Sequence, residues 1–462
     1  MGKAASYFYV ADTSDTQTLH RRIIPSNAQY DEQQVRWNEL ADFLMSELGK
    51  RSGYPIKTWL QGSYKFGTQV RPVHMAQEFD IDLGVYFCWT GDRDEGNFEP
   101  KQLKQFVQDS LEQFASQNDD VIEVASPAKP RCCRVRFKGN FHIDVPCYHL
   151  DDRLGNRSLA TEKNVWEDSD PKAIYVWFKD QFQEERRVKV RRLVRFVKAW
   201  AALKFRETER PSSLLLTVLV AEAAKDTNPL PGGDDDALSV VLRKVSDRLN
   251  TQPYVSNPID TSENLTGRLS ETSRTAFIDR IESFAERAAA AIRDENTLSA
   301  CSQWALEFEH LFPLPEPEEL DELAKSLPVV RTHPEVKVTA VSRENELLKY
   351  SGINEIGPIP KKCDIAFEVI NSFSLPGGTE YFWTVRNEGD EAEDTNDLGH
   401  TAGIGLKANE SSAYKGTHFM DCTAVLSGRT IGLRRVLVKI SGASPTKRRV
   451  NRAALLKLIG KR

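Results

Sequence analysis

The stretch WLQGSYKFGTQVRPVHMAQEFDIDLGVYF, residues 59–87, decides the fold of the first part of this chain. In its second half, apolar and acidic residues alternate. Phe79 and Ile81 fall on one face of an expected strand, and Asp80 and Asp82 share the other face. Two carboxylates side by side on one strand face repel each other, so folding alone does not favour them. A divalent cation between them would remove that repulsion, and Mg²⁺ prefers oxygen ligands. The alternation therefore predicts a strand that carries part of a metal site.

A third acidic residue lies on a later strand. The segment NFHIDVPCY, residues 140–148, places Asp144 between apolar residues after a turn at Gly139 and Asn140. If this strand lies beside the first one, Asp144 joins Asp80 and Asp82 on one sheet face, as a two-metal site requires. The alternative is that Asp144 is a strand-edge charge near a turn. We favour the metal site because the other two acids are already paired.

Other residues suit the binding of phosphate groups. Gly62 lets the backbone approach an anion closely, and Ser63 adds a hydroxyl donor at the start of an expected helix. Lys198, in the basic segment RRLVRFVKAW, would stabilise negative charge on a leaving pyrophosphate. Ser212 and Ser213 begin a later helix, where they would cap the helix, contact phosphates or do both. A solvated helix face is the alternative for the basic segment.

Composition restricts the class of protein. The chain has 462 residues, which suggests two or three domains, and 40% of them are hydrophobic, with no long apolar run. We therefore expect no membrane partner and no secretory signal. The seven cysteines are odd in number and scattered, which favours free thiols in the cytoplasm over disulfides or a zinc site. The net charge of −5 recruits no polyanion, so any nucleotide binding must be local.

The pattern of elements divides the chain into segments. Strands and helices mix up to about residue 180, which predicts an α+β lobe over 1–180. Helical patterns follow over 181–330, including a basic helix at 184–205 and a buried one at 212–225. We expect a linker at 331–345. Short alternating segments separated by Gly, Asn and Asp then predict an all-β sandwich over 346–445, followed by a basic tail at 446–462.

The order of these motifs resembles the cGAS/DncV-like nucleotidyltransferases, or CD-NTases. The Gly62–Ser63 turn, Asp80-Ile81-Asp82 and Asp144 match the family's pattern, and the similarity covers roughly residues 25–325. The resemblance implies a two-lobed, polymerase-beta-like fold with a Mg²⁺-loaded cleft, in which Mn²⁺ is a possible substitute. Asp80, Asp82 and Asp144 would be the metal ligands and catalytic residues. Nucleotide binding would fall to a set that matches the family's positions: Gln61, Gly62, Ser63, Lys198, Ser212 and Ser213.

The function implied by the resemblance is template-independent synthesis. Nucleoside triphosphates would be joined into cyclic di- or trinucleotide second messengers that activate a separate effector protein in antiphage defence of the CBASS type. Nucleic acid would not be required. Two alternatives stay open: a synthase of linear oligonucleotides, either oligoadenylate or oligodeoxyadenylate, and a catalytically silent nucleotide sensor. Base identity, linkage and the activating signal are not readable from the residues.

The β-rich segment at about 346–442 is similar to the AGS-C domain, a proposed sensor module. Aromatic residues such as Tyr381, Trp383, Tyr414 and His418 would stack on a base or hold a small ligand. Alternation places some of them in the sandwich core instead, and for Trp383 we favour the core. The acidic segment at 388–397 argues against contact with a nucleic-acid backbone there.

Overall fold

The computed structural model describes residues 2–12, 17–75, 77–315 and 333–442. The chain divides into two compact units, one over Met1–Leu314 and one over Pro315–Arg462. The expected basic tail at 446–462 lies outside the described residues. In the part of the chain that the structure describes, no helix has the length and apolar content needed to cross a membrane.

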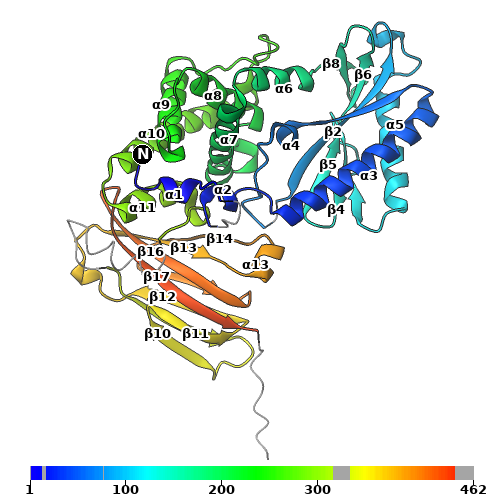
Figure 1. The fold of residues 1–462 in the computed structure, drawn as a ribbon. Coiled ribbons are helices and arrows are strands. Elements are labelled where there is room, and N and C mark those ends of the chain that lie inside the picture. Colours follow the sequence, from blue (N-terminus) through cyan, green and yellow to red (C-terminus); the bar gives the residue numbers. More distant parts are fainter. Residues whose placement is uncertain (1, 13–16, 76, 316–332, 443–462) are drawn as a thin grey trace, which may run out of the picture. The chain divides into compact units, whose positions relative to one another are not determined.

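The first unit opens with a lobe built on an eight-stranded mixed sheet (Figure 1). Its strands run in the spatial order β3-β4-β5-β2-β6-β7-β8, and β1 also pairs with β2. Their bounds are β1 Ile56–Gln61, β2 Phe79–Trp89, β3 Val121–Val124, β4 Cys133–Phe137, β5 Phe141–Val145, β6 Cys147–Asp151, β7 Arg157–Ala160 and β8 Trp166–Asp168. Strand β2 is central because β5 and β6 both pair with it in parallel, one after the other.

Two long helices cover one face of this sheet. Helix α3 (Asn27–Ser52) begins at a capping box formed by Ser26 and Gln29, and α5 (Pro100–Ser116) begins with a proline in its first turn. Both bury leucines, such as Leu44 of α3, against the apolar face of β2 and β5. The short helix α4 (Gly62–Phe66) follows β1 directly, as the sequence predicts.

The second lobe of this unit is helical, which confirms the two-lobed expectation (Figure 1). Its helices are α6 Pro171–Asp180, α7 Glu184–Lys204, α8 Ser213–Lys225, α9 Asp234–Thr251, α10 Glu271–Arg293 and α11 Thr297–Phe308. Aromatic rings fill its core. The ring of Trp200 stacks on Phe284 with centroids 4.9 Å apart, and the indole of Trp200 donates to Glu307.

The N-terminal segment packs on the helical lobe, which differs from the expected boundaries. Helices α1 (Ala5–Phe8) and α2 (Leu19–Arg22) contact α9 and α7, and Phe8 is fully buried against Phe196 and Trp304. The expected catalytic lobe at 1–180 therefore loses its first residues to the helical lobe. The reason is apolar burial: local patterns around Phe8 carry no information about which distant surface will cover it.

The second unit is a β-sandwich, as predicted. One sheet has the order β10-β9-β12-β15 and the other β11-β17-β16-β13-β14. The strands are β9 Val336–Ser342, β10 Lys349–Ile353, β11 Glu355–Pro360, β12 Cys363–Val369, β13 Glu380–Arg386, β14 Gly399–Ile404, β15 Lys407–Ser411, β16 Gly416–Leu426 and β17 Arg429–Ser441, with the short helix α13 Asp390–Asp394.

The expected linker at 331–345 is wrong over part of its length, because β9 lies inside it and pairs with β12. Residues 331–332 lie outside the described residues. Trp383 is fully buried and its indole N–H donates to the carbonyl of Gly405 at 2.7 Å, so the core placement favoured for Trp383 is confirmed. All seven cysteines are free, as expected.

Candidate active site

The register of two parallel strands brings the acidic residues together. Strand β2 pairs with β5 so that Asp80 lies opposite His142 and Asp82 lies opposite Asp144. Phe79, Ile81 and Leu83 of β2 point into the core, which turns the aspartates between them toward the opposite face. The sequence prediction that these two strands are neighbours, with their acids on one sheet face, is confirmed.

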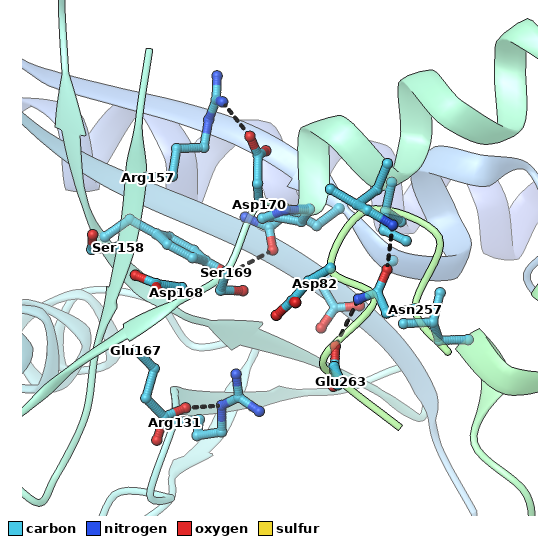
Figure 2. Close-up of a pocket in the computed structure, with 18 of the residues that line it drawn as sticks. Asp82, Arg131, Arg157, Ser158, Glu167, Asp168, Ser169, Asp170, Asn257 and Glu263 are labelled. Atoms are coloured by element: carbon cyan, nitrogen blue, oxygen red, sulfur yellow. Dashed lines mark hydrogen bonds and ion pairs between the residues drawn. The ribbon is translucent and has the colours of Figure 1, made fainter. Parts of the chain in front are cut away.

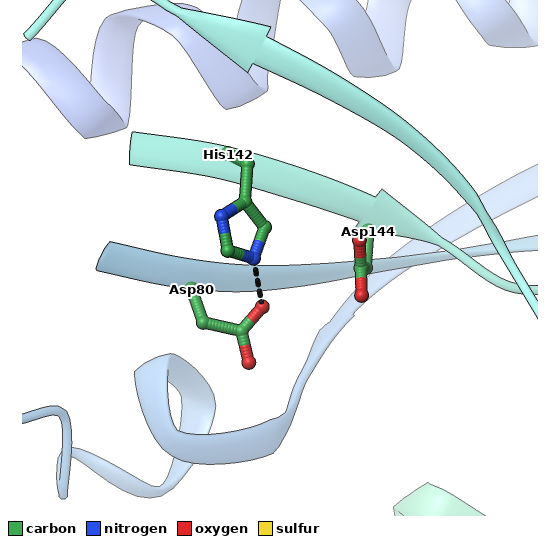
Figure 3. A group of neighbouring side chains, drawn as sticks. All are labelled: Asp80, His142 and Asp144. Atoms are coloured by element: carbon green, nitrogen blue, oxygen red, sulfur yellow. Dashed lines mark hydrogen bonds and ion pairs between the residues drawn. The ribbon is translucent and has the colours of Figure 1, made fainter. Parts of the chain in front are cut away.

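A histidine that sequence reasoning missed belongs to this group. Ligand atoms of Asp80, His142 and Asp144 all lie within 4.8 Å of one another (Figure 3). The Nε2 atom of His142 is 2.9 Å from Oδ1 of Asp80, and its Nδ1 atom is 3.0 Å from Oε2 of Glu78. Because His142 stands two residues before Asp144 on the same strand, alternation alone would have placed both on one face.

Arg134 keeps Asp144 ionised. Its Nε and Nη2 atoms donate to the two carboxylate oxygens of Asp144 at 2.5 and 2.8 Å, and Nζ of Lys129 lies 3.4 Å away. Burial would raise the pKa of Asp144, but the hydrogen bonds and charge of Arg134, with Lys129, hold that pKa below its ordinary value. Asp144 is thus a carboxylate at neutral pH.

Asp82 is in the opposite situation. Burial raises its pKa well above the ordinary value, and the charges of Asp80 and Asp144 raise it further, only partly offset by Lys198 and Arg134. A divalent cation beside these oxygen donors would compensate both the burial and the repulsion. The oxygen donors of this face therefore suit a divalent metal ion. The ligand atoms that lie within 4.8 Å of one another belong to Asp80, His142 and Asp144, so a ligand role of Asp82 stays a prediction.

A large cavity opens beside this face. It has a volume of about 1150 Å³ and takes lining residues from both lobes of the first unit. Of the predicted site residues, Gln61, Gly62, Ser63, Asp82, Lys198 and Ser213 line it. The sequence therefore identified residues that are far apart in the chain and meet in one place.

Gly62 makes the closest approach to the acidic residues. Its φ is +56°, and a Cβ atom there would lie 1.9 Å from Oδ2 of Asp82. Only glycine fits, because the conformation is left-handed and the carboxylate fills the space that a side chain would need. The Gly62–Ser63 turn and the end of the Asp80–Asp82 pair are therefore in contact.

Lys198 is buried near the acids. It is 5% exposed, and its Nζ atom donates to the carbonyl oxygen of Thr68 at 2.9 Å. Burial and the charge of Arg195 lower its pKa from 10.5 to about 8, against the opposing effect of Asp80 and Asp82. The alternative of a solvated helix face is wrong for this lysine.

Gln61 and Ser212 differ from the other predicted site residues because their side chains already bond to other parts of the protein. The side-chain amide of Gln61 donates to the hydroxyl of Tyr86 at 2.8 Å, and its carbonyl accepts from Tyr148 at 3.2 Å, so both ends of the amide are engaged by buried tyrosines. Ser212 caps α8 by accepting from the backbone N–H of Leu215 at 3.2 Å, and it is not among the cavity's lining residues. Phosphate contact by Ser212 stays a prediction, whereas its capping role is confirmed.

Polar pairs surround the part of the cavity lined by β8 and the helical lobe (Figure 2). These are Arg131–Glu167 at 3.0 Å, Arg157–Asp170 at 3.0 Å, Arg93–Asp168 at 2.5 Å and Asn257–Glu263 at 2.6 Å. Sequence reasoning missed these groups, because the pairing of two polar side chains, such as Arg93 with Asp168, leaves no local pattern in the sequence. They supply donors and acceptors for the edges of a bound molecule.

Two family models match the chain. Residues 56–148 match the nucleotidyltransferase domain of DncV-like cyclic GMP-AMP synthases, and residues 317–441 match the adenylyl/guanylyl and SMODS C-terminal sensor domain. The first model spans the Gly62–Ser63 turn and all three aspartates. These matches support a CD-NTase, a cGAS/DncV-like nucleotidyltransferase with a C-terminal sensor domain.

Relatives of this CD-NTase extend the similarity over nearly its whole length. It is 28% identical over 453 residues to a cyclic GMP-AMP synthase of Escherichia albertii, covering 96% of this chain and 98% of that one. It is 24% identical over 239 residues to a c-di-GMP synthase of Roseivirga ehrenbergii, covering 46% and 61%.

Solved structures support the fold of the first unit. Escherichia coli DncV in its 3′-deoxy GTP-bound form matches with a TM-score of 0.56 at 21% identity, covering 67% of this chain and 97% of that chain. The apo form of Vibrio cholerae DncV matches with a TM-score of 0.57 at 18% identity, covering 67% and 96%. The two-lobed architecture of this CD-NTase is therefore the DncV architecture.

Proposed function

We propose that this CD-NTase joins two nucleoside triphosphates, without a template, into a cyclic dinucleotide, with cyclic GMP-AMP as the first candidate product. The observation that carries the proposal is the acidic sheet face of Asp80, Asp82 and Asp144 beside a cavity lined by both lobes. The near-full-length similarity to a cyclic GMP-AMP synthase favours this product. The similarity to a c-di-GMP synthase makes c-di-GMP the second candidate.

The size of the cavity supports a reaction between two nucleotides. About 1150 Å³ is at the upper end of the range for small-molecule sites, which suits two substrates better than one. We assign the triphosphate of one nucleotide to the Gly62–Ser63 turn, with Lys198 and Ser213 on its other side. These groups supply backbone and hydroxyl donors and one positive charge where the pyrophosphate leaves.

Magnesium is the metal we propose for the three aspartates, with manganese as a substitute, since all the donors are hard oxygens. A bound Mg²⁺ supplies Lewis acidity, which neutralises phosphate charge and acidifies the attacking hydroxyl. Asp144, held ionised by Arg134, is the group we assign to the acceptor hydroxyl. His142 shares this face with Asp80, and its hydrogen bond to Oδ1 of Asp80 at 2.9 Å fixes the orientation of that carboxylate.

The cellular role follows from this chemistry as a further part of the proposal. A cyclic dinucleotide is a diffusible signal, so its natural partner is a separate effector protein that binds it. We place the enzyme in the cytoplasm and assign it to antiphage defence of the CBASS type. The free thiols of all seven cysteines suit a reducing compartment.

Product analysis tests the proposal. The purified full-length chain is incubated with ATP, GTP or both, and with Mg²⁺ or Mn²⁺. Phosphatase-treated products are then identified by mass spectrometry. We expect a phosphatase-resistant dinucleotide from the wild type and none from the Asp80→Asn/Asp82→Asn double variant. Thermal unfolding of the double variant should show that it is folded, and full turnover by it would contradict the assignment of the site.

Two other outcomes would select the alternatives. A phosphatase-sensitive ladder of products would indicate a synthase of linear oligonucleotides, whose site needs the same acids. Nucleotide binding without any product, under every metal and substrate combination, would indicate a sensor without catalysis. Three acids on one sheet face argue against the sensor, because a binding site without catalysis has no need to gather them.

A further inference from the structure

The second unit contains a cavity of its own, between the two sheets of the sandwich. Its volume is about 180 Å³. Apolar side chains of both sheets form its walls, among them Phe367 of β12 and Met420 and Val438 of β16 and β17. Because protein interiors are normally close-packed, a space of this size among buried side chains is a candidate binding site.

Polar groups gather at one end of this cavity. The hydroxyl of Tyr414 donates to Oδ2 of Asp397 at 2.8 Å, and Nε2 of His400 lies 2.7 Å from Oε1 of Glu410. His418 donates from Nε2 to the carbonyl of Tyr414 at 2.9 Å. Tyr414 and His418 are two of the aromatic residues for which the sequence suggested a ligand contact. Tyr381, another of them, is buried in the core at 5% exposure.

The charge of the lining is negative. Asp397 and Glu410 line the cavity, while no lysine or arginine among the described residues does so. A phosphate group placed there would meet two carboxylates, and the imidazole of His400 beside them is already paired with Glu410 at 2.7 Å. An ionised carboxylate is acceptor-only and offers about four acceptor positions, so one phenol or imidazole partner leaves it able to accept further donors.

Size also restricts the occupant. A volume of about 180 Å³ is well below the range of drug-sized sites and far below the 1150 Å³ of the catalytic cavity. A cyclic dinucleotide, with two bases and two phosphates, fits neither the space nor the charge. A single flat ring system suits this space, against the apolar side chains of Phe367 and Met420 and with its polar edge toward the carboxylates.

We propose that this cavity binds one uncharged, nucleobase-sized heteroaromatic ring whose N–H groups donate to Asp397 and Glu410. Phosphorylated forms of the same molecule are excluded by the negative lining. The site is therefore distinct from the catalytic cavity in both size and charge preference, and its ligand is neither the substrate triphosphates nor their cyclic product. The proposal does not rest on the reaction proposed above.

Equilibrium dialysis of the full-length chain tests this. The probes are guanosine and cytidine, which carry donor groups on their base edges, and their 5′-monophosphates as charged counterparts. We expect at least one nucleoside to bind, and its monophosphate to bind at least tenfold more weakly to the sandwich site. Two variants identify that site: Asp397→Asn, which nearly preserves shape, and Ala413→Trp, which covers the mouth from an exposed position.

The expected result is a loss of nucleoside affinity of about tenfold or more in both variants, because each removes a charged acceptor or the access to it. The matched control is Asp364→Asn, an exposed acid of β12 that pairs with Arg343 outside the cavity. It should bind as the wild type does, and all three variants should unfold at similar temperatures. Unchanged binding in both cavity variants, equal binding of the monophosphates, or no binding of either nucleoside at millimolar concentration would overturn the proposal.

Discussion

Replacing Lys198 with methionine should make the enzyme more stable and a poorer binder of nucleotides. The fall of its pKa from 10.5 to about 8 means that keeping Lys198 charged at pH 7 costs the folded state about 3 kcal/mol. Methionine fills a similar volume without charge, but it loses the hydrogen bond to Thr68, which contributes about 1 kcal/mol. The net gain is about 2 kcal/mol, or a rise of several degrees in the unfolding temperature.

The stability difference between Lys198→Met and the wild type should depend on pH. Below pH 8 the lysine is charged in both the folded and unfolded states, so the full penalty applies to the wild type. Between pH 8 and 10.5 the unfolded state binds more protons than the folded state, so wild-type stability should rise with pH across this window. The advantage of Lys198→Met should therefore be largest at pH 7 and fade as pH approaches 10.5.

Nucleotide binding should change in the opposite direction. A charged hydrogen bond to a phosphate contributes about 1.5–3 kcal/mol, so Lys198→Met should weaken the binding of a non-hydrolysable GTP analogue by about 10- to 100-fold. Thermal unfolding with and without the analogue measures both effects. The control is Lys204→Met on the same helix, whose lysine pairs with Glu309 at 2.7 Å and should not affect binding. A variant of Lys198 that is less stable than wild type at pH 7, or that binds equally well, would refute the reasoning.

Three further predictions concern other residues of the two units. Gly62→Ala should reduce turnover at least 100-fold in steady-state kinetics, because the added Cβ atom would displace the carboxylate of Asp82. Near-normal turnover would contradict the contact between Gly62 and Asp82. His142→Asn should weaken Mn²⁺ binding, measured by electron paramagnetic resonance, by about 10- to 100-fold, because Asp80 loses its hydrogen bond to His142. Unchanged Mn²⁺ affinity would exclude a positioning role for His142. Asp421→Asn should lower the free energy of unfolding of the second unit by about 3–5 kcal/mol in calorimetry, because it leaves the buried Arg386 and Arg435 without their carboxylate. A decrease below about 1 kcal/mol would mean that water compensates the two arginines.

The acidic face was predictable because strand alternation is a local signal. Asp80 and Asp82 are separated by one buried residue, and the same spacing around Asp144 reveals a second strand of the same kind. The partners of these acids were not predictable. Arg134 and Asp144 lie on the two strands of a hairpin, and the register of β4 and β5 places them opposite each other. That register depends on the packing of the whole sheet.

The boundary of the second unit shows how competing signals limit such predictions. The linker expected at 331–345 contains the alternation Val336, Val338 and Ala340, whose side chains are buried in the sandwich, but the Pro- and Glu-rich segment before it obscured the start of the strand. The alternation was present in the sequence and should have outweighed the composition of its neighbours.

The three aspartates differ in how far nearby groups stabilise their negative charge. This difference indicates which carboxylate a metal ion would stabilise most. Asp144 is held ionised by Arg134, and Asp80 is held by His142. Asp82, whose carboxylate lies against the Gly62 turn, has its pKa raised by burial and by the charges of Asp80 and Asp144, which Lys198 and Arg134 offset only in part. A divalent cation on this face would ionise Asp82, so metal binding should release a proton at any pH at which the raised pKa keeps Asp82 protonated. Because Gly62 touches Asp82, ionisation of that one carboxylate couples the metal face to the turn assigned to the triphosphate.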